Sequence, residues 1–308
     1  MSAMIVVGGE SLIDLIVHPN GRVSAIPGGG PFNTARTIGR LGGSAAYLGR
    51  ISTDRFGRSM LDRLRLDGVD CRLVQTTDAP TTLAVAELDE SGAASYHFYL
   101  DGTAAPGLSD VGLAGALAGM DTQAIHIGTL GLVLEPMATT LEALVAAVAD
   151  DVVVLLDPNC RPSATPDHAA LLARVERLAA RADVIKASLD DLQFLFPLLD
   201  VDQAVAALLA RGVSAVLVTD GGNAIRIVTA RGATTLPVPQ IAVVDTVGAG
   251  DAFGGALLSS WIGRGLGRAE LAEQELLGES VEFAIRVASE TCRRAGAEPP
   301  TAAELAMG

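Results

Sequence analysis

Short apolar runs that end in turn or polar residues alternate along the chain with longer stretches in which apolar residues recur at helical spacing. The short runs predict buried strands over residues 4–8, 45–49, 124–128, 152–156, 184–186 and 215–219. The longer stretches predict helices over residues 33–41, 57–67, 136–149, 168–182 and 201–211. Strands that alternate with helices form right-handed βαβ units, and these build a parallel sheet covered on both faces. The pattern therefore predicts a three-layer α/β/α fold with a mostly parallel sheet, whose ligands bind at the carboxyl ends of the strands.

Two regions, residues 10–27 and 81–100, break this alternation. They contain strand-like segments at 12–17, 23–26, 81–88 and 95–100, with no long helix between them. We predict that these segments form a small antiparallel β-sheet projecting from a main domain made of residues 1–9, 28–80 and 101–308. Because this sheet is interleaved with the first helices, its position suits a lid over a cleft. An edge hairpin without a functional role is the alternative.

Composition narrows the classes of partner. The 308 residues are 49% hydrophobic but only 4% aromatic, so the core must consist mainly of Ala, Val and Leu. The formal net charge of −14 argues against a nucleic acid or an anionic membrane as the main partner, because both require a basic surface. A phosphorylated ligand is still compatible with this charge, since backbone N–H groups bind phosphate locally.

The beginning of the chain and its cysteines indicate the cytoplasm. No basic segment precedes the first apolar run, and no apolar run approaches the roughly 18 residues of a membrane span. Cys71, Cys160 and Cys292 lie far apart without the spacing of a zinc site, which favours reduced thiols. We therefore expect a soluble cytoplasmic protein.

Residues 245–256, with the sequence DTVGAGDAFGGA, carry the strongest functional signal. The small residues Gly248, Ala249 and Gly250 let the backbone approach a ligand closely, and residues 251–261 predict a helix. The N–H groups of the loop would then point out of a helix N-terminus, which attracts anions. A carboxylate at Asp251 would be kept ionised there and would accept a proton from an alcohol, while the amides stabilise a transferring phosphoryl group.

Other interpretations of this loop compete with the catalytic one. Asp251 would also serve to cap a helix that follows a tight turn. Gly248, Gly250 and Gly254 loosely match a dinucleotide-binding fingerprint, but that fingerprint normally follows the first strand of its unit, and Asp251 would repel a pyrophosphate. The chain has no GxxxxGK[ST] sequence, which argues against a P-loop NTPase.

Two sequences more than two hundred residues apart resemble the signatures of a single enzyme family. Residues 245–253 are similar to the C-terminal signature of the ribokinase-like (PfkB) carbohydrate kinases, and residues 28–35 (GGGPFNTA) with 39–42 are similar to their N-terminal signature. Further elements occur in family order at residues 9–14, 54–57, 157–162, 186–191 and 219–221. The resemblance covers nearly the whole chain. It implies a Rossmann-like sheet with a small β lid, and phosphoryl transfer from ATP with Mg²⁺, frequently helped by a monovalent cation.

The resemblance also implies roles for individual residues. Asp251 would be the catalytic base, and Gly248, Ala249 and Gly250 would form the anion hole. Sugar hydroxyls would be held by polar side chains and by glycine backbone, at Asp14, Gly28, Gly29 and Asn33. This is chemically sensible, because a carboxylate and an amide can each make paired hydrogen bonds to neighbouring hydroxyls. Without the family match, Asn33 would serve equally well as a helix cap and Asp14 as a surface residue.

The nucleotide and metal sites depart in part from the family pattern. The family's T-x-G-x-x-G becomes Thr219-x-Gly221-x-x-Ala224, and its Asn-x-x-Glu becomes Ser188-x-x-Asp191, whose shorter carboxylate can still hold Mg²⁺ through water. The residues expected at ATP are Lys186, Ser188, Thr219, Gly221, Gly248 and Gly250. Lys186 and Arg161 are cations suited to contact phosphate, although each would also fit a surface ion pair. Asp245 and the carbonyl groups of Thr246 and Val247 lie where the family binds K⁺.

The choice of sugar is predicted from the lid. Residues 94–104, 157–161 and 291–297 look most like the corresponding parts of fructokinase-type members. If the strand alternates, Tyr96 and Phe98 share one face and close over the sugar, which Arg161 would also contact; the alternative is that they pack the lid core or a dimer interface. Fructose is therefore the predicted substrate, with 2-keto-3-deoxygluconate and ribose as alternatives and nucleoside kinase activity left open.

A regulator that binds sugar or nucleotide on the same fold is the non-enzymatic alternative. The intact Asp251 and anion hole argue against it, because a sensor needs no base. Since the family's lid often forms the dimer contact, we expect a homodimer formed through the lid.

Overall fold

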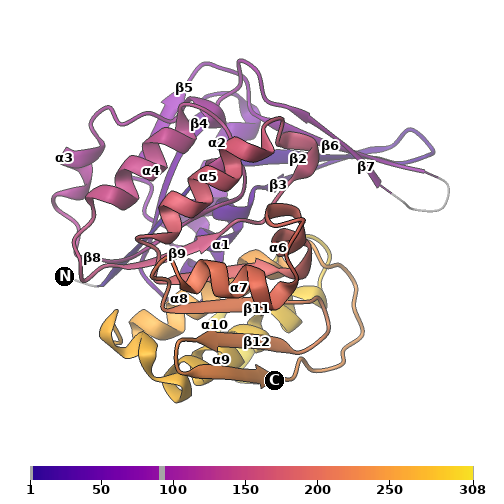
Figure 1. Ribbon diagram of the computed structural model, residues 1–308. Coiled ribbons are helices and arrows are strands. Elements are labelled where there is room, and N and C mark those ends of the chain that lie inside the picture. The colour runs from indigo at the N-terminus through magenta and orange to yellow at the C-terminus, as the bar shows by residue number, and fades with distance from the viewer. Residues whose placement is uncertain (1–2, 90–93, 308) are drawn as a thin grey trace.

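The computed structural model describes residues 3–89 and 94–307. Among these residues, nine strands form a central sheet in the order β13–β12–β11–β10–β9–β8–β1–β4–β5 (Figure 1). The strands are β1 (Met4–Gly8), β4 (Ala45–Ser52), β5 (Val74–Thr77), β8 (Thr122–Gly128), β9 (Val153–Asp157), β10 (Val184–Ser188), β11 (Ala215–Thr219), β12 (Ile225–Thr229) and β13 (Gly232–Leu236). The neighbouring strands from β5 through β11 pair in parallel, and the β12–β13 hairpin adds two antiparallel strands.

Helices cover both faces of this sheet. One face carries α1 (Gly30–Arg40), α2 (Arg55–Leu66), α8 (Ala249–Gly263) and α9 (Gln274–Cys292), and the other carries α3 (Leu113–Leu117), α4 (Met137–Ala147), α5 (His168–Ala179), α6 (Leu189–Leu195) and α7 (Val201–Leu209). Successive residues of a strand point to opposite faces, so Val153 and Leu155 join one core and Val154 and Leu156 join the other. The predicted three-layer α/β/α fold is confirmed. A last helix, α10 (Ala302–Met307), ends the described chain.

A second, four-stranded sheet extends away from these layers at the right of Figure 1. Its order is β3–β2–β6–β7, with β2 at Leu12–Val17, β3 at Val23–Gly28, β6 at Leu83–Leu88 and β7 at Ala94–Tyr99. The two hairpins are antiparallel as predicted, but the central β2–β6 pair that joins them is parallel. We refer to this sheet as the lid. Its opening and closing, and the boundaries at residues 10–27 and 81–100 that separate it from the main domain, stay predictions.

The lid is anchored at its base by a small apolar cluster. Leu12 and Ala84 from the lid pack with Leu130 and Ala164 from the main layers, and Phe98 lies partly buried against them. Within residues 3–89 and 94–307, no helix combines the length and apolar character needed to cross a membrane.

Candidate active site

Asp251 lies in the first turn of α8. The N-cap of this helix is Gly248, which has a left-handed φ of 76°, and a Cβ at this position would come within 2.5 Å of the Cβ of Ala297. Both constraints favour glycine. The helix begins at Ala249 rather than at residue 251, so the predicted start was two residues late. The helix N-terminus therefore carries Asp251 within a turn of small residues, where the helix dipole favours negative charge.

An amide group approaches each oxygen of the Asp251 carboxylate. Asn33 Nδ2 on α1 donates a hydrogen bond of 2.9 Å to Oδ2, and Asn159 Nδ2 lies 3.5 Å from Oδ1. Burial raises the pKa of Asp251, while the Asn33 hydrogen bond and the charges of Lys186 and Arg161 oppose that rise. The carboxylate is thus held in place by donors that favour its ionised form.

The residues predicted to hold sugar hydroxyls gather beside Asp251. A side chain on Gly28 would collide with the Asp14 carboxylate, and a Cβ on Gly29 would come within 2.7 Å of the Glu10 carbonyl oxygen. Gly29 also has a left-handed φ of 106°. Burial, and after it the nearby charge of Asp251, raise the pKa of Asp14 to about 6. The structure therefore brings Asp14 and the backbone of Gly28 and Gly29 close to Asn33 of α1 and Asp251 of α8.

Glu10 is a buried site neighbour that belongs to the family-like element at residues 9–14, but the sequence analysis gave it no role. Its side chain is 1% exposed, Oε1 accepts a hydrogen bond of 3.0 Å from the Gly30 N–H, and Oε2 accepts one of 3.2 Å from the Gly131 N–H. Burial raises the pKa of Glu10 to about 8. Its place in that element, two residues after the buried strand β1, was the available signal. Glu10 ties the glycine loop before α1 to the segment that follows β8.

The predicted nucleotide residues line a cleft of about 360 Å³ beside the first turn of α8. Its lining includes Lys186, Ser188, Asp191, Thr219, Gly221, Thr246, Ala249 and Gly250, whereas Gly248 does not line it. The lining also includes apolar side chains, those of Ile225, Val238, Ile241, Phe253, Ile285 and Ala288. Apart from Phe253, which belongs to the signature at 245–253, no motif marked these apolar residues, because they come from β12, α9 and the loop before α8 and meet only in the fold. The cleft therefore offers both apolar surface and groups that bind anions.

A buried ion pair lies at this cleft, because Lys186 is one of the residues that line it. Lys186 Nζ is 2.8 Å from Asp157 Oδ2, and the two side chains are 5% and 3% exposed. A Cβ on Gly250 would lie 3.0 Å from Lys186 Nζ, so the cation sits directly against the first turn of α8. Burial disfavours the charged lysine, but the carboxylates of Asp157, Asp191 and Asp251 together outweigh this effect and raise the pKa of Lys186. The predicted phosphate contact Lys186 is therefore charged and fixed in place.

The Asp191 carboxylate stabilises two backbone segments at the cleft. Its Oδ2 accepts hydrogen bonds from the Ser188 N–H (2.8 Å) and the Ser188 hydroxyl (2.7 Å). The Asp191 N–H in turn donates to Ser188 Oγ (3.0 Å), so that Ser188 and Asp191 form the capping box of α6. Its Oδ1 accepts a hydrogen bond of 2.6 Å from the Cys160 N–H. Asp191 therefore lines the cleft as a fixed carboxylate.

Asp245 joins the loop before α8 to the segment after α9. Its Oδ1 accepts from the Val247 N–H (3.0 Å) and its Oδ2 from the Gly296 N–H (2.8 Å). The N–H groups of Val244 and Asp245 both donate to the Cys292 carbonyl. The predicted cation residues Asp245, Thr246 and Val247 thus form a single turn. Across the described part of the chain, no group of three or more His, Cys, Asp or Glu side chains is arranged to hold a metal ion by itself.

Phe98 and Arg161 lie at the edges of the site. The register pairs Ala84 with Phe98 and Asp14 with Ala84, so Phe98 shares the Asp14 face of the lid. Tyr96 shares this face, as predicted, but is 51% exposed. Arg161 is exposed, and its Nη1 donates to the backbone and side-chain oxygens of Asn159. Neither arrangement tests a contact with sugar, so both roles stay predictions.

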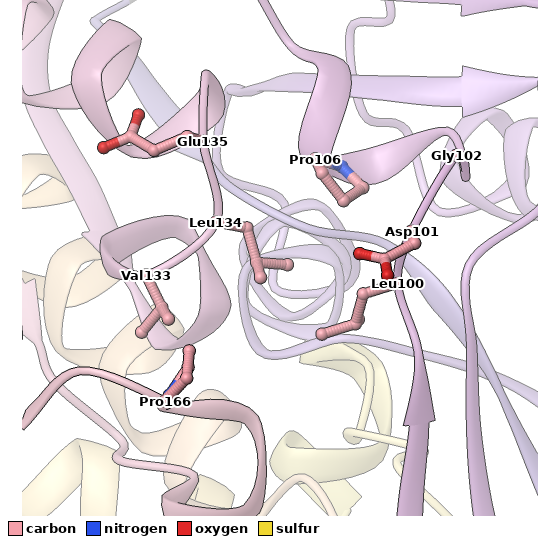
Figure 2. Close-up of a pocket in the computed structure, with 8 residues that line it drawn as sticks. All are labelled: Leu100, Asp101, Gly102, Pro106, Val133, Leu134, Glu135 and Pro166. Carbon is pink, nitrogen blue, oxygen red and sulfur yellow. The ribbon is translucent and has the colours of Figure 1, made fainter.

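A second hollow, of about 250 Å³, lies at the base of the lid (Figure 2). Leu100, Leu134 and Pro106 face it in Figure 2, and the carboxyl groups of Asp101 and Glu135 lie at its border. The Glu135 carboxylate is paired with Arg174. None of the predicted site residues lines this hollow. The predicted nucleotide contacts other than Gly248 line the cleft beside α8 instead.

Comparison with known proteins assigns the chain to a family of enzymes. The profile of the pfkB family carbohydrate kinases matches residues 2–303. The chain belongs to the pfkB family of carbohydrate kinases. The kinase is 36% identical to a fructokinase of Rhizobium leguminosarum bv. trifolii over 83% of this chain and 79% of the relative, and 32% identical to fructokinase-1 of Zea mays over 98% of this chain and 96% of the relative.

Solved structures of fructokinases share the fold of this kinase. The fructokinase of Xylella fastidiosa with bound ATP has a TM-score of 0.89 and 26% identity, and covers 100% of this chain and 98% of its own. A double mutant of the Vibrio cholerae O395 fructokinase, with fructose, ADP and a potassium ion bound, has a TM-score of 0.84 and 27% identity, and covers 98% of this chain and 95% of its own. The sequence-based assignment to the family is therefore confirmed.

Proposed function

We propose that this carbohydrate kinase transfers a phosphoryl group from ATP to a hydroxyl of free fructose. The observation that carries the proposal is the place of Asp251. Its carboxylate lies at a helix N-terminus between the group formed by Asp14, Gly28 and Asn33 and the cleft that contains Lys186. The relatives named fructokinase, and the relative whose structure holds fructose and ADP, support fructose as the substrate.

Each group has a chemical task in this proposal. Asp251 accepts the proton of the attacking hydroxyl, and Asn33 keeps the carboxylate oriented. The backbone of Gly248, Ala249 and Gly250 at the helix N-terminus stabilises the charge on the transferring phosphoryl group, and the Lys186 ammonium adds a fixed positive charge. Asp14, Gly28 and Gly29 hold the sugar, and Phe98 and Arg161 close the pocket from the lid and the rim.

Magnesium enters this scheme with ATP as part of the substrate. The lack of a three-ligand acidic cluster within the described residues agrees with an ion that arrives on the nucleotide phosphates. Asp191 lines the cleft and would order the water shell of that ion, while Ser188, Thr219 and Gly221 would contact the nucleotide. When bound, Mg²⁺ supplies charge neutralisation between the phosphates.

A monovalent cation would bind at the turn of Asp245, Thr246 and Val247. Backbone carbonyl and carboxylate oxygens suit K⁺, and this turn adjoins the first turn of α8. The potassium ion in the Vibrio cholerae relative supports the idea.

The proposed homodimer would form through the lid. On the lid face opposite Asp14, the strand register places Leu15, Val17, Val23, Val85 and Tyr99 together, and these apolar side chains are half-buried or exposed. Covering such a face is favourable. We also place the enzyme in the cytoplasm, where ATP and reduced thiols are available.

A coupled assay of ADP release with fructose, ribose and 2-keto-3-deoxygluconate tests the proposal. We expect fructose-dependent ADP release, and we expect Asp251→Asn to lower turnover by at least about a hundredfold because the base is lost. Asp62→Asn, an exposed aspartate of α2, is the matched control and should keep wild-type turnover. ADP release with none of the three sugars would favour the regulator, and near-wild-type turnover of Asp251→Asn would refute the assignment of the base.

A further inference from the structure

Among the described residues, the non-glycine residues with left-handed backbone are Thr129, with φ 52°, and Asn159, with φ 39°. They follow the carboxyl ends of the neighbouring parallel strands β8 and β9. This conformation is uncommon for asparagine and a genuine outlier for β-branched threonine. Such strain persists only where the surroundings impose it, and it is concentrated at functional sites.

The two strained residues contact each other, and Asn159 also lies beside Asp251. Asn159 Nδ2 lies 3.2 Å from Thr129 Oγ1 and 3.5 Å from Asp251 Oδ1. All three side chains converge on the Cα of Gly30: a Cβ there would lie 2.5 Å from Thr129 Oγ1, 3.2 Å from Asp251 Oδ1 and 3.4 Å from Asn159 Nδ2. The strained backbone is therefore part of the immediate surroundings of the carboxylate.

The orientation of the Asn159 amide is fixed from its other end. Arg161 Nη1 donates a hydrogen bond of 2.8 Å to Asn159 Oδ1. Because a guanidinium can only donate, Oδ1 must face Arg161, and Nδ2 must then face Thr129 and Asp251. The next residue is held as well, since the Cys160 N–H donates to Asp191 Oδ1 at 2.6 Å. These contacts hold the loop in its strained conformation.

We infer that Asn159 and Thr129 are positioning residues for Asp251. The left-handed backbone aims the Asn159 amide at Asp251 Oδ1, while Asn33 holds Oδ2, and Thr129 Oγ1 keeps the Asn159 amide in the plane that reaches the carboxylate. Two donors on opposite oxygens fix the rotation of the carboxylate, so that a lone pair of the base points to the sugar hydroxyl. This inference rests on the proposed role of Asp251 as the base.

Glycine substitutions separate this role from ordinary structural support. Glycine accepts the left-handed backbone without strain, so Asn159→Gly and Thr129→Gly should melt at the same temperature as the wild type or higher. Their kcat for fructose should nevertheless fall by about ten- to a hundredfold, since small misplacements of a reacting group have effects of this size. Thr129 does not line the nucleotide cleft, so the KM for ATP of Thr129→Gly should change by no more than about twofold. Asn159 does line that cleft, so the unchanged KM for ATP is expected of the threonine variant alone.

Two further variants serve as controls. Thr129→Ser keeps the hydroxyl that contacts Asn159 and should retain kcat within about twofold of the wild type. Asn20→Gly alters an exposed asparagine in the β2–β3 turn, whose Oδ1 accepts from the Arg22 N–H, and should leave kcat unchanged.

The outcomes are separable. Values of kcat within about twofold of the wild type for both glycine variants would overturn the inference. A loss of kcat accompanied by a clear drop in melting temperature would also overturn it, because the residues would then support the fold and not the base. If Asp251→Asn loses turnover while the glycine variants keep it, the positioning role fails and the proposed function stands. If Asp251→Asn keeps its turnover, the proposed function fails first.

Discussion

Replacing Lys186 with methionine tests whether the buried cation under α8 serves catalysis or only balances a charge. Methionine has a similar length and no charge. The change would leave the Asp157 carboxylate buried without a counter-ion, and its Oδ1 already lacks a hydrogen-bond partner among the described residues. The variant should therefore lose both stability and activity, for two different reasons.

The loss of stability follows from the burial of the pair. The two side chains are 5% and 3% exposed, and removing one partner of a buried pair costs about 3–5 kcal/mol. For a large domain this corresponds to a melting temperature lower by roughly 6–20 °C. Burial already raises the pKa of Asp157 to about 6 beside Lys186, and it will be higher without the lysine. Since the folded protein then favours protonated Asp157, the deficit should shrink as pH falls from about 8 to about 5.

The double variant Lys186→Met/Asp157→Asn separates the two effects. It removes both charges and should recover most of the melting temperature, because no uncompensated charge remains in the core. Its kcat should stay about a hundredfold or more below the wild type, the usual effect of losing one donor to the transition-state charge. Calorimetry and the coupled ADP assay measure both quantities. Recovery of kcat together with stability would refute the view that Lys186 acts on the phosphoryl group.

Two further predictions concern the sugar. Asp14→Ala should weaken fructose binding in calorimetric titration with little effect on ATP affinity, because hydrogen bonds to the sugar are lost. In the wild type, fructose affinity should fall as pH drops through about 6, where burial places the pKa of Asp14. Unchanged fructose affinity in the variant would move the sugar pocket elsewhere. Phe98→Ala should lower kcat/KM for fructose and raise ATP hydrolysis in the absence of sugar, because the partly buried ring excludes water from the site. A sugar panel that favours ribose or 2-keto-3-deoxygluconate by about tenfold, roughly 1.4 kcal/mol, would contradict fructose but not the kinase activity.

The buried parallel strands were predictable because both of their faces are apolar. The strands at 4–8 and 215–219 have the predicted bounds, whereas β5, β12 and β13 were not predicted. The sequences of β5 (VQTT) and β13 (GATTL) are short and largely polar, and the residues of β13 are mostly exposed, so neither carries a hydrophobic pattern. Pairing with β4 and with β12 fixes these strands, and the sequence alone does not contain that information. Helix α9 was also missed, because Gly278 and buried serines such as Ser280 dilute its apolar face.

The residues of the site were likewise predictable only in part. Motifs located Asp251, Asn33 and Lys186, since their residue types at those spacings already specify the chemistry. Glu10 and Asn159 lie in the family-like elements at 9–14 and 157–162, but their roles were not predicted, because these depend on backbone angles and on buried contacts. The left-handed φ of Asn159 cannot be read from a sequence, and Glu10 differs from a surface glutamate only by its burial.

The hydrogen bond between Asn33 and Asp251 joins residues 218 positions apart, and it has a consequence for biosynthesis. Helix α1 is buried from Gly30 to Ile38, and α8 packs directly on it. Arg36, 1% exposed, donates to the carbonyl of Ala297 and pairs with Asp67 and Glu298. A nascent chain on the ribosome must therefore carry α1 uncovered, with a cation not yet fully paired, until almost all of the protein has been translated. Early-terminated products should be unfolded and prone to aggregation, and the earliest helix of the chain should be among the last to reach its final surroundings.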